Sequence, residues 1–163
     1  MIKILTLAGG IAGGAALSQY PEFSQQYTQR LAGQVDTLAE IGADFDASAL
    51  RSGLTRTQAL AQMTGTQFLN DRHDDMQRVF TRHVILSENL TALRTASPMA
   101  RLAMPHRLTD TETFTNTWAD YNPAMPLTLS GGIAALAGFL GGWAATGVVL
   151  SLLLWPFKRR KTV

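Results

Sequence analysis

The residues best suited to chemistry lie in one polar stretch, NDRHDDMQRVFTRH, at positions 70–83. Its carboxylate and imidazole groups are of the types that bind a divalent metal or transfer protons, and they are Asp71, His73, Asp74, Asp75 and His83. On a helix Asp71 and Asp75 would share a face while His73 points elsewhere, and the chain has no His-x-x-x-His or Glu-x-x-His pair. The alternating acids and arginines are more typical of a solvated helix face. We therefore expect no metal site and no cofactor.

Other catalytic signatures are absent from the sequence. The chain has no cysteine, which excludes thiolate catalysis and disulfides, and it has no Gly-x-Ser-x-Gly, phosphate loop or dinucleotide fingerprint. No ionisable side chain interrupts the two long apolar segments, so a proton relay is also disfavoured. We expect no enzymatic activity and no small-molecule substrate.

The charges are segregated along the chain. All 12 acidic residues lie between Glu22 and Asp120 together with nine arginines, which gives this interval a net charge of −3. The other basic residues are at the ends and are Lys3, Lys158, Arg159, Arg160 and Lys161. The isoelectric point of about 9.3 therefore describes two basic ends, not a surface suited to nucleic acid.

Two apolar segments predict membrane-spanning helices. Residues 127–155 contain no charged side chain, although about 20 residues suffice to cross the hydrocarbon core. We place one transmembrane helix at 126–157, followed by a basic cytoplasmic tail at 158–163, and a shorter one at 1–20. The alternative for the first segment is a cleaved signal peptide, with Lys3 as its charged region.

Small residues recur at helical spacing in both segments, and the phrase LTLAGGIA at 5–12 returns as LTLSGGIA at 127–134. Each stripe would let another helix approach closely, which drives association in lipid. The predicted helix-packing face comprises Gly9, Gly13 and Ala16 in the first segment, and Gly131, Ala135, Gly138, Gly142 and Ala145 in the second. Its partner could be the other span, a second copy of the chain or another membrane protein.

The basic ends predict the orientation of the spans. Short basic segments remain in the cytoplasm, so both termini are expected there and residues 21–125 outside it. Aromatic and basic residues at the ends of the spans are expected to anchor them at the membrane surface. These predicted anchors are Tyr20, Tyr121, Trp155, Lys158, Arg159, Arg160 and Lys161.

The middle section has the periodicity of helices. Apolar residues recur every three or four positions from Phe23 to Phe45, after which DFDAS and the Gly53 region predict a break. Thr55 and Gln58 have capping-box spacing, Ser97-Pro98 predicts a helix end, and Thr109 with Glu112 predicts another cap. A heptad-like stripe comprises Met76, Val79, His83, Leu86, Leu90 and Leu93. This stripe either packs inside an extracytoplasmic, coiled-coil-like helical hairpin or is a partner-docking surface.

Three segments carry a family resemblance: QYPEFSQQYTQRLAGQVDTL, GADFDASALRSGLTRTQAL and AMPLTLSGGIAALAGFLGGW. They resemble an uncharacterised family of proteobacterial two-span inner-membrane proteins, a domain of unknown function. The resemblance implies a bacterial inner-membrane protein, and it transfers no catalytic residue.

The sequence thus predicts an all-α membrane protein with two transmembrane helices flanking an extracytoplasmic helical domain. The leading functional hypothesis is a non-catalytic accessory or scaffold subunit, which packs through its Gly/Ala faces in a larger membrane complex. The alternatives are a small homo-oligomeric pore and a single-anchor periplasmic binding module. The expected partners are membrane lipid and other membrane subunits or a second copy of the chain.

Overall fold

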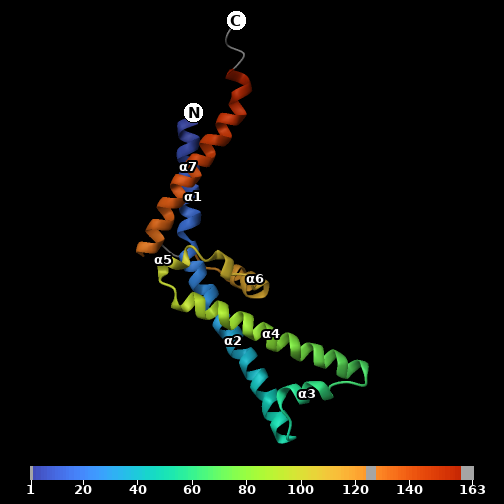
Figure 1. The fold of residues 1–163 in the computed structure, drawn as a ribbon. Helices are drawn as coiled ribbons and strands as arrows, with labels where there is room; N and C mark the ends of the chain where they lie inside the picture. Colours follow the sequence, from blue (N-terminus) through green and yellow to red (C-terminus); the bar gives the residue numbers. More distant parts are fainter. Residues whose placement is uncertain (1, 124–127, 159–163) are drawn as a thin grey trace. The chain divides into compact units, whose positions relative to one another are not determined.

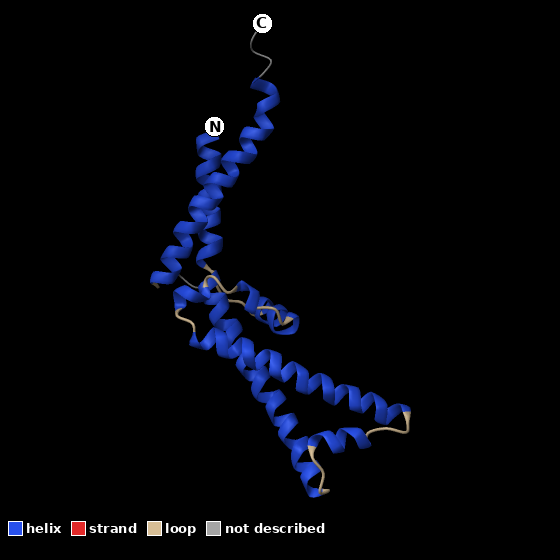
Figure 2. Cartoon of the chain, viewed as in Figure 1, coloured by secondary structure: helices blue, strands red, loops and turns tan. Residues whose placement is uncertain are grey.

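The computed structural model describes residues 2–123 and 128–158, with side chains described as far as Leu153. Throughout these residues the regular structure is helical and contains no strand, so the all-α prediction is confirmed (Figure 2). The element order is α1, α2, α3, α4, α5, η1, α6 and α7 (Figure 1). Most of the predicted basic tail, at 159–163, lies outside the described residues, as does the segment 124–127.

Helices α1 (Ile2–Ser18) and α7 (Leu129–Lys158) lie side by side (Figure 1). Two stretches of helix, Ile2–Arg51 and Leu129–Leu153, are long and apolar enough to cross a membrane. Within their most apolar windows only 22% and 11% of the residues are buried. The core helix of a soluble protein would be mostly buried, so this exposure agrees with helices that could cross a membrane.

Helix α2 (Tyr20–Arg51) follows α1 after a single residue, Gln19. Pro21 explains this break, because it has no backbone N–H to donate to the carbonyl of Leu17 and its ring would crowd that carbonyl. The Gln19 N–H instead donates to the carbonyl of Ala16, three residues earlier (3.3 Å). Regular bonding then resumes from the Phe23 N–H to the Gln19 carbonyl (3.0 Å).

The predicted break occurs at the Gly53 region but not at DFDAS, because α2 continues through DFDAS to Arg51. The Ser48 hydroxyl donates to the Asp44 carbonyl of the same helix (2.9 Å), so it does not form a cap. Asp46 is also part of the helix, and its exposed carboxylate accepts a hydrogen bond from Arg56 on the following helix (2.8 Å from Nε to Oδ1). The chain turns at Gly53, whose φ of 68° suits glycine.

The capping box at Thr55 is present and starts α3 (Arg56–Gln62). Helix α4 (Gln67–Thr95) ends before Ser97, which caps the short helix α5 (Pro98–Arg101). The 3-10 helix η1 (Pro105–Arg107) and helix α6 (Thr111–Ala119) follow. The predicted cap Thr109 is wrong by one residue, since the carboxylate of Asp110 accepts the Thr113 N–H (2.9 Å).

The chain forms two compact units. We call residues 1–26, 97–105 and 118–163 the hairpin unit, and residues 27–96 and 106–117 the bundle unit. The start of α2, α5 and the end of α6 thus group with the two apolar helices. The predicted boundaries at 20 and 126 concern membrane topology and stay a prediction. The largest fully buried side chains of the bundle unit are Tyr27, Leu31, Leu93 and Thr113.

Candidate functional site

The closest helix contact in the hairpin unit is made where side chains are missing. A Cβ atom added to Gly13 or Gly138 would overlap the backbone carbonyl of the other residue. The same holds for a Cβ on Gly142 against the Gly9 carbonyl, and a Cβ on Gly9 would lie 3.2 Å from the Gly142 carbonyl oxygen. Helices α1 and α7 of one chain thus approach backbone to backbone at two glycine pairs.

Phe139 contributes the main side chain to this contact. A Cβ on Gly10 would lie 2.8 Å from its ring, and one on Gly14 would lie 3.4 Å from its Cβ. The two glycines of α1 therefore leave the space that the Phe139 side chain fills. Gly14 also faces the Ala135 carbonyl, which would be 2.9 Å from an added Cβ.

The packed face is not the whole stripe predicted from the sequence. Gly9, Gly13, Gly138 and Gly142 lie in the contact and Gly131 is buried, but Ala16 and Ala145 are exposed. Their places are taken by residues four positions apart, which are Gly10, Gly14 and Ser18 in α1 and Thr146 in α7. Rows of period four are those used by close GxxxG crossings, whereas the predicted steps of three and four describe a left-handed coil.

Hydroxyl groups in the hairpin unit bond to nearby main chain. Thr6 donates to the Lys3 carbonyl (3.0 Å) and Ser18 to the Ala15 carbonyl (2.7 Å), both within α1. Thr128 accepts the Gly131 N–H (3.1 Å) and so caps the start of α7. These bonds satisfy polar groups that would be expensive to leave unpaired in an apolar surrounding.

An aromatic cluster lies in the hairpin unit, near the junction of α1 and α2. Phe23 packs edge-on against Trp118 (5.8 Å between centroids) and Tyr121 (5.6 Å). The Tyr121 hydroxyl is 3.1 Å from the Gln19 carbonyl oxygen and 3.0 Å from its side-chain oxygen, and Tyr20 donates to the Arg101 carbonyl (3.2 Å). The predicted anchors Tyr20 and Tyr121 are thus joined to main chain near this junction.

Sequence reasoning did not single out Trp118, which belongs to this cluster and is 67% exposed. Its position three residues before Tyr121 was the available signal. Of the other predicted anchors, Trp155 and Lys158 lie in α7 beyond the described side chains, and Arg159, Arg160 and Lys161 lie outside the described residues.

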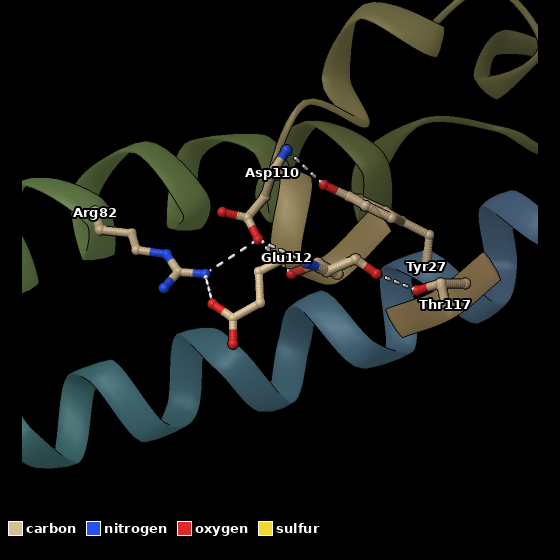
Figure 3. A network of polar contacts seen from close by, with 6 residues as sticks. Tyr27, Arg82, Asp110, Glu112 and Thr117 are labelled. Atoms are coloured by element: carbon tan, nitrogen blue, oxygen red, sulfur yellow. Dashed lines mark hydrogen bonds and ion pairs between the residues drawn. The ribbon is translucent and has the colours of Figure 1, made fainter. Parts of the chain in front are cut away.

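The bundle unit contains a polar network around Asp110 (Figure 3). The Asp110 carboxylate accepts the N–H and the hydroxyl of Thr113 (2.9 and 2.7 Å) and an N–H of Arg82 (3.1 Å). Arg82 also donates to Glu112 (2.7 Å), and the Asp110 N–H donates to the Tyr27 hydroxyl (3.3 Å). Asp110 therefore joins α4 and the start of α6 through its carboxylate, and α2 through its backbone N–H.

The electrostatics of this network favour its charged form. Burial alone would raise the pKa of the Asp110 carboxyl group, but hydrogen bonds from Thr113 and Arg82 outweigh it and lower that pKa. Hydrogen bonds to Glu112 and Asp110 raise the pKa of Arg82. The ion pair is thus structural, and neither group is poised to transfer a proton near neutral pH.

The heptad-like stripe of α4 lies mainly inside the bundle unit. Met76, Leu86, Leu90 and Leu93 are buried, whereas Val79 and His83 are partly exposed. Burial of these four residues favours the packing alternative over docking. Outside the stripe, Val84 and Ile85 are 55% and 51% exposed.

The residues first considered for chemistry, in the stretch 70–83, contact their near neighbours along α4, and we call this row of contacts the polar ladder. Asp75 pairs with both Arg72 (3.0 Å) and Arg78, while His73 contacts Asp74 (3.1 Å) and Gln77 (3.3 Å). His83 lies three turns away from His73 and contacts Ser87 (3.4 Å). In the part of the chain that the structure describes, no three His, Cys, Asp or Glu residues are arranged to hold a metal ion.

An open groove of about 610 Å³ runs beside this ladder. Its lining comprises Asp74, Gln77, Arg78, Thr81, Arg82, Ile85, Leu86, Thr109 and Asp110. The groove thus combines charged groups with the exposed side chain of Ile85.

Comparison with known proteins gives one match. No curated protein and no solved structure matches the chain. A family model described as "Protein of unknown function (DUF2937)" matches residues 1–159, nearly the whole sequence, in agreement with the resemblance to a domain of unknown function. The chain is a member of this DUF2937 family.

Proposed function

We propose that the chain is a non-catalytic accessory or scaffold subunit of the bacterial inner membrane, which anchors a helical domain and presents it to a partner protein. Two helices long and apolar enough to cross a membrane support the anchor. The groove on α4, with the exposed Ile85 in its lining, supports binding of a partner protein, and it is the observation that carries the proposal.

The proposal differs from the sequence hypothesis in how the glycines are used. Gly9, Gly13, Gly138 and Gly142 face each other within one chain, so they are occupied before any other subunit binds. The anchor is then a self-packed pair, and partner recognition falls to the bundle unit. There the groove offers Ile85 as an apolar contact, with Asp74 and Arg78 as charged groups along its side.

The proposed topology has both termini in the cytoplasm and the bundle unit in the periplasm. It is supported by the basic residues near both ends and the excess of acids in the middle. Because the chain has no cysteine, single cysteines report cleanly on it. A membrane-impermeant maleimide should label Ser52→Cys, but not Thr162→Cys, in intact spheroplasts; the reverse pattern would invert the orientation.

Gentle detergent extraction followed by mass spectrometry of the co-purified proteins tests the proposed function. We expect a defined complex with the native chain, its loss with Ile85→Asp and its retention with Leu50→Asp. Leu50 is the matched control, because it is also exposed (77%) and apolar but does not line the groove.

Recovery of the chain alone, as a homo-oligomer, would reject the subunit and favour the pore. Intact-mass analysis tests the single-anchor alternative. A mature chain that starts at Leu17 or Gln19 would have lost α1 and would favour that alternative.

A further inference from the structure

We infer that the hairpin unit binds one ethanolamine phospholipid where α1 and α7 meet α2 and α5. The inference rests on the membrane insertion proposed above. It is carried by two adjoining crevices, each of about 310 Å³, which share Tyr20 and Leu102 in their walls.

The first crevice is apolar and lies on the membrane-spanning helices. Leu17 at the end of α1 and Ile133 and Ala137 near the start of α7 line it, together with Tyr20 and Leu102. Its walls offer no charged side chain, so it suits a hydrocarbon chain. Because α7 begins here, the crevice lies at the level where the spans leave the apolar layer.

The second crevice adjoins the first and has the more polar lining. Its lining adds Glu22 and Arg101, the two charged residues among its walls, and Ser130 at the start of α7. A guanidinium group binds phosphate oxygens well, and a carboxylate binds an ammonium group. One cation and one anion beside an apolar crevice therefore match a zwitterionic headgroup, whose phosphate would meet Arg101 and whose ammonium would meet Glu22.

This charge pair separates the proposed ligand from other lipids. Phosphatidylglycerol offers a phosphate to Arg101, but it brings a net negative charge toward Glu22 and offers no cation. An ethanolamine phospholipid offers an opposite charge to each of the two groups. The position beside Tyr20 is also typical of the interfacial layer in which headgroups lie.

Native mass spectrometry of the full chain in nanodiscs of equal phosphatidylethanolamine and phosphatidylglycerol tests the inference. We expect one retained phosphatidylethanolamine per chain. Arg101→Gln should lower its retention roughly tenfold, as expected for the loss of a charged hydrogen bond. Glu22→Gln should shift the preference toward phosphatidylglycerol.

Ala137→Trp should abolish retention by filling the apolar crevice. Leu136→Trp is the matched control, because Leu136 is the neighbouring residue, is 59% exposed and does not line either crevice. Equal retention of both lipids, no retained lipid, or an unchanged preference in Arg101→Gln and Glu22→Gln would overturn the inference.

Carbonate extraction of native membranes distinguishes failure of the inference from failure of the anchor. A chain that stays in the membrane pellet but retains no specific lipid rejects only the lipid site. A chain released by carbonate rejects the proposed membrane anchor as well.

Discussion

The closest contacts of the hairpin unit join backbones, whereas those of the bundle unit join long side chains. Gly13 and Gly138 leave no room for a methyl group between α1 and α7. In the bundle unit, Tyr27 and Leu93 are fully buried and Arg82 reaches across to Asp110. In lipid, apolar side chains gain little by association, so close backbone approach is effective; in water, burial of large side chains dominates.

The largest expected effect comes from filling the backbone contact. Gly138→Leu should separate α1 from α7 at a cost of roughly 3 kcal/mol or more, because the new side chain meets the Gly13 carbonyl and not a flexible group. Disulfide formation between cysteines at Thr6 and Gly147, which face each other across the contact, should fall sharply. Gly141→Leu is the control, since nothing lies within 4 Å of its added Cβ. Equal crosslinking in the two leucine variants would remove the distinction between the units.

Asp110→Ala should have the next largest effect, confined to the bundle unit. It removes the cap of α6 and the partner of Arg82, at a cost of about 2 kcal/mol in the free energy of unfolding. Thermal unfolding followed by circular dichroism measures this loss. Asp74→Ala is the matched control, because the Asp74 carboxylate is 68% exposed. The network is not structural if the two variants unfold at the same temperature.

Acid should weaken the bundle unit through the same carboxylate. Because the folded pKa of Asp110 is lowered, its stabilisation is complete above the unfolded pKa of about 3.9 and is lost as the pH falls through the lower folded value. Asp110→Asn keeps an oxygen for the cap but loses the charge, at a cost of about 1.5 kcal/mol at neutral pH. The gap in stability between wild type and Asp110→Asn should narrow below pH about 4. A gap that is constant down to the acid transition would contradict this assignment.

Arg56→Ala should have the smallest effect of the four changes. Its ion pair with Asp46 is exposed, and its guanidinium lies 4.2 Å from the centre of the Phe80 ring, so the expected loss is about 1 kcal/mol or less. Added salt should reduce that loss, because exposed charges are screened. The measurement is chemical denaturation at low and high salt, and a loss above that of Asp110→Ala would reverse the ranking.

Local signals in the sequence predicted several elements well. Thr55 and Gln58 predicted the cap of α3, since both bonds of a capping box lie within four residues. The two candidate spans were also predicted from a local signal, the length of each uncharged apolar segment. The predicted break is found at Gly53 but not at DFDAS, because turn-forming residues become helical when partners such as Arg56 bind their side chains.

Contacts between distant segments were beyond sequence reasoning. The spacing of Gly9 and Gly13 predicts a face of small residues. Whether that face continues at every fourth residue, or at alternating steps of three and four residues, depends on how the helices cross. Ala16 and Ala145 were assigned to the face on the second assumption and are exposed. Arg82 and Asp110 are 28 residues apart, and no local pattern marks them as partners.

Phe139 has a consequence for how the anchor would respond to bilayer thickness. A slide of α7 by one turn would bring Phe139 against Thr6 or Ser18 in place of one of its two glycines, where a side chain already occupies the space. The register is therefore fixed, and the pair cannot lengthen or shorten by sliding. In a thicker or thinner membrane the two helices would respond as one rigid body, either by tilting together or by deforming the surrounding lipid.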